Sequence, residues 1–326
     1  MAATKPLVIV TRKLPEGVER ELAERFETRL NASDTPMDAA ALKRAVAEAD
    51  VLVPTVTDRV GAEIVAAAGA RLKLIANFGV GYNHIDVKAA AARGISVTNT
   101  PGVLTDATAD IGMTLMLAAT RRAIEGAKVL ESGAFTGWCP TWMMGVGLRG
   151  KKLGIVGMGR IGEAMALRSR AFGMEIHYHK RKRAEPALER ALEAQYWKSL
   201  DAMLPAMDIV SINCPYTPET YHLFSAERLA RMKPSAYLIN TARGEIVDEA
   251  ALADALADGR LAGAGLDVFE HEPKVNAKLL SLKNVALLPH LGSSTIEART
   301  GMGNKVIANI AAFVEGCALP DRVTVA

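Results

Sequence analysis

A glycine-rich stretch between two apolar runs constrains this chain more than any other feature of its sequence. The apolar run Leu153–Val156 leads into a Gly-x-Gly-x-x-Gly pattern made by Gly157, Gly159 and Gly162. An amphipathic helix is expected next, and Gly173 ends it just before another apolar run. In such a frame the first glycine makes a tight turn, the second lets a phosphate approach the backbone, and the third lets helix and strand pack closely. The frame therefore predicts a dinucleotide site at the helix N-terminus, with a tight turn that binds nothing as the alternative.

Short β-rich runs alternate with helical patterns over the whole chain, which predicts an α/β protein. Buried parallel strands are expected at 6–10, 51–56, 72–78 and 95–100, and later at "KLGIV", "MEIHYH", "IVSIN", "AYLINTA", "AGAGLDV" and "VALLP". Long helices are expected at 105–131 and 294–315, and the second begins with Ser294 and Glu297 at capping-box spacing. The aperiodic stretch 132–150, rich in glycine and aromatic residues, is expected to connect two domains.

The bulk composition limits the classes of function. With 326 residues, half of them hydrophobic, the chain is long enough for two domains, and a net charge of +3 gives no support to a nucleic-acid or membrane partner. Three widely spaced cysteines argue against a disulfide framework. The N-terminal apolar run is too short for a signal peptide. We expect a soluble cytoplasmic protein without a metal site.

Four consecutive cations occupy the place where a dinucleotide-binding fold usually presents a carboxylate. The second strand of such a fold ends beside the adenosine ribose, and Asp or Glu there accepts a hydrogen bond from the 2′-hydroxyl. Here that place falls at about His179 to Arg181, within a stretch that includes Lys180, Arg181 and Lys182, and the next carboxylate is Glu185. These cations would neutralise a 2′-phosphate, so the sequence predicts NADP(H), with NAD(H) as a weaker alternative. A solvated basic loop and a short targeting or nucleic-acid patch are the competing interpretations.

A second glycine turn, "NFGVGYNHID", follows a strand in the first part of the chain. His84 stands where a third glycine would be, so close helix packing against a dinucleotide is not expected. The N–H groups of Val80 and Gly81 could instead receive a small anion. A plain glycine turn is an equally supported interpretation.

Three polar residues follow strands in the second part of the chain. Arg243 follows "LINTA", Glu272 lies in the loop after "GLDVF", and His290 follows "VALLP". An arginine at a strand end can bind a carboxylate through two parallel hydrogen bonds, and a histidine held by a carboxylate can transfer a proton. Taken singly, each has a structural alternative: a surface ion pair, a solvated loop acid and a hydrogen-bonded structural histidine. Their combination beside a dinucleotide fold favours catalysis.

In their order and spacing, "GMGRIG", "NTARGEIVDE", "DVFEHEP" and "PHLGSST" resemble the D-isomer-specific 2-hydroxyacid dehydrogenases, and the resemblance covers essentially the whole chain. Within that family, "NFGVGYNHID" and the segment with Trp138 and Trp142 are most similar to the glyoxylate/hydroxypyruvate reductases. The resemblance implies two doubly wound parallel-sheet domains. A Rossmann-type cofactor domain, 101–289, would be inserted into a flavodoxin-like substrate domain made of 1–100 and 290–326.

The resemblance also implies an activity and its residues. The expected reaction is reduction of small 2-oxo acids, glyoxylate and hydroxypyruvate, to glycolate and D-glycerate with NADPH, by a homodimer built around the helix 105–131. Arg243 would bind the substrate carboxylate and carbonyl, His290 would be the acid/base with Glu272 as its partner, and Val80 and Gly81 would bind substrate through their N–H groups. Cofactor contacts are implied for Gly157, Gly159, Arg160, Ile161, Gly162, Lys180, Arg181, Lys182, Thr241, Ala242, Arg243 and Asp267.

Other functions stay open at this point. Another D-2-hydroxyacid dehydrogenase, including one that oxidises phosphoglycerate, or a phosphite dehydrogenase would use the same fold. Formate dehydrogenase is disfavoured, because that enzyme carries an amide where Glu272 stands. A cofactor-sensing corepressor is a binding protein on the same fold, and the lack of long disordered tails here disfavours it.

Overall fold

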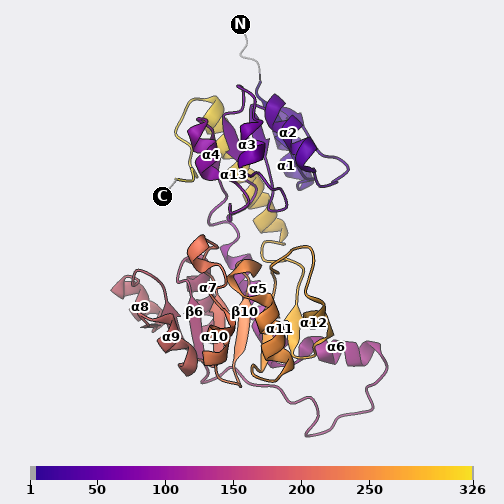
Figure 1. The fold of residues 1–326 in the computed structure, drawn as a ribbon, viewed down its shortest axis with the longest axis vertical. Coiled ribbons are helices and arrows are strands. Elements are labelled where there is room, and N and C mark those ends of the chain that lie inside the picture. Colours follow the sequence, from indigo (N-terminus) through magenta and orange to yellow (C-terminus); the bar gives the residue numbers. More distant parts are fainter. Residues whose placement is uncertain (1–4, 325–326) are drawn as a thin grey trace. The chain divides into compact units, whose positions relative to one another are not determined.

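The computed structural model describes residues 5–324, which divide into two compact units (Figure 1). Unit 1 comprises 5–104 and 295–324 of these residues, and unit 2 comprises 105–294. Unit 2 is therefore inserted into unit 1 in sequence. The crossings expected after residues 100 and 289 lie a few residues before the observed divisions at 104/105 and 294/295. As a result His290, which we expected in the substrate domain, falls in unit 2.

Unit 1 contains a parallel sheet in the order β2-β1-β3-β4-β5. Its strands are β1 (Leu7–Val10), β2 (Glu27–Arg29), β3 (Val51–Val53), β4 (Leu74–Ala76) and β5 (Ser96–Thr98). The order reverses direction between β1 and β3, as in flavodoxin-like sheets. Every residue of β3 and β4 is buried, which explains their continuous apolar sequences. The edge strand β2 has the sequence ETR and was not expected.

Helices cover both faces of this sheet. They are α1 (Glu16–Arg25), α2 (Ala39–Glu48), α3 (Ala62–Ala66), α4 (Val87–Ala92) and α13 (Ile296–Val314). The second chain segment supplies α13, which packs against α1 and β4. The expected cap at Ser294 is wrong. Thr295 is the N-cap, because it has an extended backbone and its side chain accepts a hydrogen bond from the N–H of Ala298 (3.0 Å).

Unit 2 contains a parallel sheet in the order β12-β11-β10-β9-β6-β7-β8. Its strands are β6 (Lys152–Val156), β7 (Glu175–His179), β8 (Gln195–Tyr196), β9 (Ile209–Ile212), β10 (Tyr237–Asn240), β11 (Gly263–Leu266) and β12 (Val285–Leu287). Counted from β6, this is the Rossmann order 3-2-1-4-5-6 with one added strand, and it reverses direction between β6 and β9. The predicted Rossmann-type and flavodoxin-like sheets are thus confirmed.

Buried clusters lie on the two faces of the unit 2 sheet. On one face α5 and α7 pack around Leu115 and Met165, and on the other α9, α10 and α11 pack around Phe224 and Leu252. The helices of the unit are α5 (Thr105–Thr120), α6 (Ala123–Glu131), α7 (Arg160–Ala171), α8 (Pro186–Leu192), α9 (Leu200–Met203), α10 (Ala226–Arg231), α11 (Glu249–Ala257) and α12 (Ala277–Ser281). Short 3-10 turns are η1 (Leu204–Ala206), η2 (Pro218–Thr220) and η3 (Gly244–Ile246).

The prediction of a single helix at 105–131 is wrong, because this segment forms two helices, α5 and α6. Arg122 adopts a left-handed backbone (φ 53°) between α5 and α6, and its guanidinium forms two hydrogen bonds to Glu125. The carbonyl of Thr120 accepts the N–H of Val146 (2.8 Å), from a segment that returns past the end of α5. This tertiary bond satisfies a terminal helix carbonyl, so α5 ends where local sequence favours continuation.

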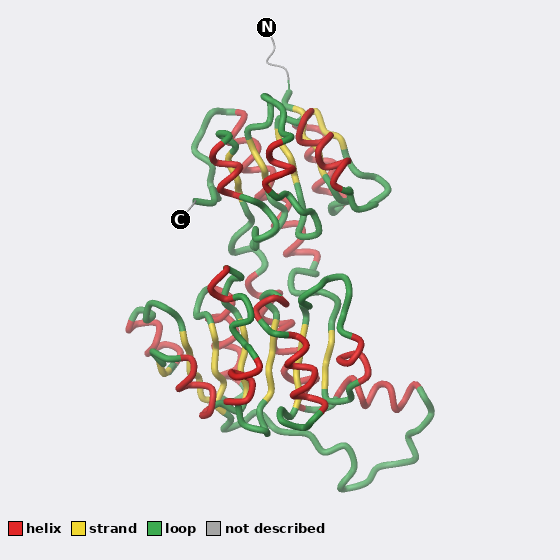
Figure 2. Tube along the Cα trace, viewed as in Figure 1, coloured by secondary structure: helices red, strands yellow, loops and turns green. Residues whose placement is uncertain are grey.

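The stretch 132–150 is not a domain connection. It lies wholly within unit 2, and Figure 2 shows it as a long loop (green) that leads from α6 back to β6. The rings of Phe135 and Trp142 stack in this loop with centroids 5.7 Å apart. Trp138 is 85% exposed and Trp142 43%, so neither is a core residue. Within 5–324, no helix combines the length and apolar character that crossing a membrane requires.

Candidate active site

The glycine loop lies at the reversal point of the unit 2 sheet, between β6 and α7. Gly157 has φ 100°, and a Cβ atom there would lie 2.5 Å from the backbone nitrogen of Cys214. A Cβ atom at Gly162 would lie 2.2 Å from the carbonyl oxygen of Gly157, so both positions require glycine. At Gly159 a Cβ would meet nothing within 4 Å, which leaves open space in front of the helix N-terminus.

The start of α7 offers unpaired donors to that open space. Gly159 is the N-cap and provides no side-chain cap. The first N–H groups of a helix, here those of Arg160 and Ile161, have no partner within the helix and attract anions. The loop therefore fits the pyrophosphate of a dinucleotide, both by its shape and by its donors.

The basic run follows β7 directly, as predicted, and its four cations have different surroundings. The Lys180 ammonium donates to the carbonyl of Met158 in the glycine loop (3.0 Å). Arg183 forms a two-bond salt bridge with Glu189 of α8, and this pairing, with a hydrogen bond from Tyr178, lowers the pKa of Glu189 to about 2.

Arg181 and Lys182 form no salt bridge with any residue of the described chain. Three cations of the run, Lys180, Lys182 and Arg183, line a hollow of about 300 Å³ between α7 and α8, whose other lining residues are Glu163, Ala184, Glu185 and Leu188. The two middle cations of the run are thus available to a ligand, whereas Arg183 is engaged in the fold.

The three predicted catalytic residues come from the ends of neighbouring strands. Arg243 follows β10, Glu272 lies in the loop after β11, and His290 follows β12. These strands pair in parallel, so their carboxyl ends share one edge of the sheet. The Nδ1 atom of His290 lies 2.8 Å from Oε2 of Glu272. The histidine and the carboxylate that the sequence separates by 18 positions therefore form a hydrogen-bonded pair.

Glu272 is held in the ionised form. Its other carboxylate oxygen accepts the N–H of Phe269 (3.0 Å). Burial alone would raise the pKa of Glu272, but the hydrogen bond and charge of His290, the Phe269 N–H and the charge of Arg243 bring that pKa below its ordinary value. An ionised Glu272 accepts from Nδ1, which leaves Nε2 of His290 as the nitrogen available to a substrate.

Arg243 is partly buried and lies in a loop that hydrogen bonds to Asn240 hold in place. Burial lowers its pKa, against the opposing influence of Glu245 and Glu272. The Asn240 side chain donates to the Arg243 carbonyl (2.9 Å) and accepts the N–H of Ala242 (3.0 Å). Asn240 therefore shapes the segment Thr241–Arg243, and its only signal in the sequence is its place at a strand end.

Asp267, which the family resemblance implied as a cofactor contact, is fully buried in this structure. Its two carboxylate oxygens accept the N–H groups of Leu291 and Gly292 (2.7 Å each), and its carbonyl accepts that of His290 (2.9 Å). His290 itself has a left-handed backbone (φ 56°), an unfavourable conformation for a non-glycine residue. Asp267 thus fixes the backbone of the loop His290–Gly292 through three hydrogen bonds.

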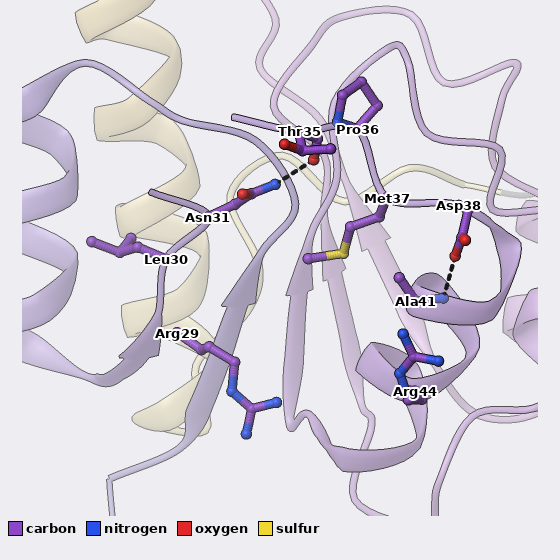
Figure 3. Close-up of a pocket in the computed structure, with 9 residues that line it drawn as sticks. All are labelled: Arg29, Leu30, Asn31, Thr35, Pro36, Met37, Asp38, Ala41 and Arg44. Carbon is purple, nitrogen blue, oxygen red and sulfur yellow. Dashed lines mark hydrogen bonds between the residues drawn. The ribbon is translucent and has the colours of Figure 1, made fainter. Parts of the chain in front are cut away.

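The predicted anion turn lies in unit 1, after β4. No helix starts there, since α4 begins only at Val87, and the N–H groups of Val80 and Gly81 donate to no acceptor in the described chain. A separate hollow of about 350 Å³ lies in the same unit, between the end of β2 and α2 (Figure 3). Arg29, Met37 and Arg44 line it with six other residues, and none of the nine is a predicted site residue.

Two further groups were missed by sequence reasoning. The side-chain amides of Asn77 and Asn99 donate to the carbonyls of the turn Gly79–Gly81. His222 and Glu270 form a second histidine-carboxylate pair (2.7 Å), in the unit that also holds His290. No group of three or more His, Cys, Asp or Glu side chains able to hold a metal occurs among residues 5–324.

Comparison with known proteins agrees with this arrangement. The family described as D-isomer specific 2-hydroxyacid dehydrogenase, NAD binding domain, matches residues 113–292. The glyoxylate reductase of Thermococcus litoralis is 46% identical over 323 residues, which are 98% of this chain and 97% of that protein. That of Pyrococcus horikoshii is 44% identical, over 98% of this chain and 96% of that protein.

Solved structures give the same result. An NADPH-dependent glyoxylate/hydroxypyruvate reductase from Sinorhizobium meliloti, in complex with NADP and malonate, has a TM-score of 0.88 and 37% identity, covering 98% of this chain and 97% of that chain. A glyoxylate reductase from Paecilomyes thermophila has a TM-score of 0.87 and 32% identity, covering 99% of each. By sequence and by fold, the chain belongs to the D-isomer-specific 2-hydroxyacid dehydrogenase family.

Proposed function

We propose that this protein is an NADPH-preferring reductase of glyoxylate and hydroxypyruvate, which it converts to glycolate and D-glycerate. The observation that carries the proposal is the His290–Glu272 hydrogen bond of 2.8 Å, on the same sheet edge as Arg243 and in the unit that carries the glycine loop. The similarity to glyoxylate reductases over nearly the whole chain supports the substrate class.

The dinucleotide is proposed to bind unit 2. Gly157, Gly159 and Gly162 would make room for its pyrophosphate, and the N–H groups of Arg160 and Ile161 would bind it. Thr241, Ala242 and Arg243 are further proposed contacts. When bound, NADPH supplies the hydride that the reaction requires. For Asp267, whose oxygens are occupied by backbone N–H groups, we propose a bracing role instead of direct contact.

The protein's own groups then bind the substrate and supply a proton. Arg243 would bind the substrate carboxylate and carbonyl, and its partial burial strengthens both interactions. His290 would donate a proton from Nε2 to the carbonyl oxygen as negative charge develops there, while Glu272 fixes the orientation of the ring. Unit 1 would contribute the N–H groups of Val80 and Gly81 to the substrate, which makes it the substrate-binding domain.

The choice of NADPH over NADH rests on the basic run. Lys180, Arg181 and Lys182 follow the strand that ends beside the adenosine ribose in this fold, and two of them line a hollow. The run contains no carboxylate to accept from a 2′-hydroxyl. Charge-assisted hydrogen bonds to a 2′-phosphate contribute roughly 1.5–3 kcal/mol each, which favours NADPH by about ten- to a thousandfold once screening is allowed for.

The assembly and the location are proposed as well. A homodimer is supported by the exposed apolar side chains of α6 and the loop that follows it, namely Leu130, Phe135, Trp138, Trp142 and Met144. Such a cluster on a protein of this kind usually marks an interface. A cytoplasmic location is supported by the three free cysteines, which suit a reducing compartment.

The test is a panel of 2-oxo acids with each cofactor. We expect oxidation of NADPH with glyoxylate and hydroxypyruvate, slower reaction with phenylpyruvate, and a lower kcat/KM with NADH. Faster reduction of phenylpyruvate would contradict the substrate class, and equal use of NADH would contradict the cofactor preference. Cofactor binding without turnover of any 2-oxo acid would favour a sensing role in place of catalysis.

A further inference from the structure

We propose that Asn77 and Asn99 are positioning residues for substrate binding. Their side-chain amides hold the carbonyls of the Val80–Gly81 turn on one side, so that the N–H groups of Val80 and Gly81 are fixed on the other, where they bind the substrate. The inference rests on the proposed function of this turn and adds the residues that determine its conformation.

The Asn77 amide binds two carbonyls of the turn at once. Asn77 is the first residue after β4 and its side chain is fully buried. Its Nδ2 atom donates to the carbonyls of Gly79 and Gly81, each at 3.0 Å. Its Oδ1 atom lies 3.0 Å from Nε2 of His84, which can donate to it. Each of its polar atoms thus has a partner, and the amide is held in one orientation.

Asn99 binds the carbonyl that Asn77 does not reach. Its Nδ2 atom donates to the carbonyl of Val80 (2.8 Å), and the backbone N–H of the adjacent Thr100 donates to that of Gly79 (3.0 Å). The backbone of Asn99 is itself anchored, because its N–H donates to the carbonyl of Asp321 (3.2 Å). Three successive carbonyls of the turn, those of residues 79, 80 and 81, are therefore bonded within unit 1.

Peptide geometry converts these bonds into an orientation for the N–H groups. In a planar trans peptide, the carbonyl of one residue and the N–H of the next point in opposite directions. Fixing the carbonyl of Gly79 therefore fixes the N–H of Val80, and fixing the carbonyl of Val80 fixes the N–H of Gly81. Neither N–H donates to an acceptor within 5–324, so both are available to a ligand.

This arrangement suits a carboxylate in particular. A carboxylate has two oxygens that each accept N–H donors, and preorganised donors bind it without the cost of reorienting the backbone. Asn77 sets the direction of the Val80 donor, and Asn99 sets that of the Gly81 donor. Each asparagine thus controls one hydrogen bond to the anion, although neither is proposed to contact it.

The isosteric substitutions Asn77→Asp and Asn99→Asp test the proposal. Each keeps the shape of the side chain but replaces the N–H donor by an oxygen, which repels the carbonyl it faces. Loss of one oriented donor to a charged group predicts a fall in kcat/KM for glyoxylate of about 10- to 100-fold. The change should appear as a raised KM, with kcat and the dissociation constant of NADPH near those of the parent.

Asn31→Asp is the matched control. Asn31 also lies in unit 1 just after a strand, and its amide donates to the carbonyls of Thr11 and Thr35 (2.7 Å each; the second bond is drawn in Figure 3). That loop contains no proposed substrate residue. The control should lose some stability in urea denaturation, less than Asn77→Asp because Asn31 is only half-buried, while keeping the KM for glyoxylate of the parent.

A second measurement separates this inference from the proposed function. The dissociation constant of oxalate, a two-carbon dicarboxylate, is measured by calorimetry in the presence of NADP. Asn99→Ala, which only deletes the donor, serves if the aspartate variants do not fold. An active parent whose folded variants keep its KM and its oxalate affinity would overturn the inference alone. A parent that neither reduces glyoxylate nor binds oxalate would overturn the proposed function, and this inference with it.

Discussion

The two glycine turns of the molecule obtain exposed backbone N–H groups in different ways. In unit 2 the turn that begins at Gly157 leads directly into α7, and the helix leaves its first donors unpaired. In unit 1 the turn at Gly79–Gly81 is followed by no helix, and the side chains of Asn77 and Asn99 hold the carbonyls instead. A helix start is one way to orient a row of donors, and a pair of buried amides is another.

The difference extends to the chemistry of the two units. Unit 2 holds all three proposed catalytic side chains and the basic run, whereas unit 1 is proposed to offer only backbone donors. Substitutions in unit 2 should therefore change turnover, cofactor choice or, at Arg243, the binding of the substrate carboxylate. Substitutions in unit 1 should change substrate affinity or stability and leave turnover intact.

Replacing His290 by alanine should cause the largest loss. Removal of a general acid typically lowers turnover by 10²–10⁴-fold, and the affinity for NADPH should change little because the glycine loop is untouched. Steady-state kinetics and a cofactor titration measure the two quantities. His222→Ala is the control, since it removes a comparable hydrogen bond to Glu270 in the same unit. Turnover near that of the parent in His290→Ala would end the catalytic assignment.

The second largest effect should be a change in the preference for NADPH over NADH. In the double variant Arg181→Ala, Lys182→Ala, the ratio of kcat/KM for NADPH to that for NADH should fall by about ten- to a thousandfold, since two cations without salt bridges are lost. Arg183→Ala is the control, because its guanidinium is engaged by Glu189. This control should lower stability and keep the ratio. A double variant with the ratio of the parent would show that the run is an ordinary basic loop.

Arg243→Lys should have a smaller but clear effect. Lysine keeps the positive charge but cannot form two parallel hydrogen bonds to a carboxylate. Loss of one charge-assisted bond predicts a fall in kcat/KM of about 10- to 100-fold. Substrate kinetics at saturating NADPH measure it. Equal kcat/KM in the parent and the lysine variant would contradict the carboxylate role.

Much of the fold could be predicted because buried strands have distinctive sequences. The fully buried β3 and β4 have the sequences VLV and LIA, and both were expected. The edge strands β2 and β8 have the sequences ETR and QY and were missed, since a partly exposed strand of two or three residues leaves no periodic pattern. The break after α5 was missed because it depends on a bond between Thr120 and Val146, which local propensity does not describe.

The part of the site that could be predicted consists of side chains that follow the carboxyl ends of neighbouring strands. Arg243, Glu272 and His290 follow adjacent parallel strands, so their place in the sequence already fixes their common edge. Asn77, Asn99 and Asn240 were not selected, because the role of an amide depends on which carbonyls surround it. Asn77 and Asn240 did leave one signal: each lies at the end of a buried strand, directly before a turn.

The smallest predicted effect concerns stability at the start of α13. Thr295→Ala should lower the free energy of unfolding by about 1 kcal/mol, because its side chain accepts the N–H of Ala298 and alanine leaves that donor unpaired. Urea denaturation measures the change. Ser294→Ala is the matched control, since Ser294 is exposed and caps no helix N–H, and it should alter stability by less than about 0.5 kcal/mol. Both variants should keep the turnover of the parent, because neither side chain is proposed to contact substrate or cofactor.

A larger loss of unfolding free energy in Ser294→Ala than in Thr295→Ala would restore the capping box that the sequence suggested. A fall in turnover in Thr295→Ala would show that the start of α13 takes part in the reaction, and that the division of tasks between the units is less strict than the structure suggests.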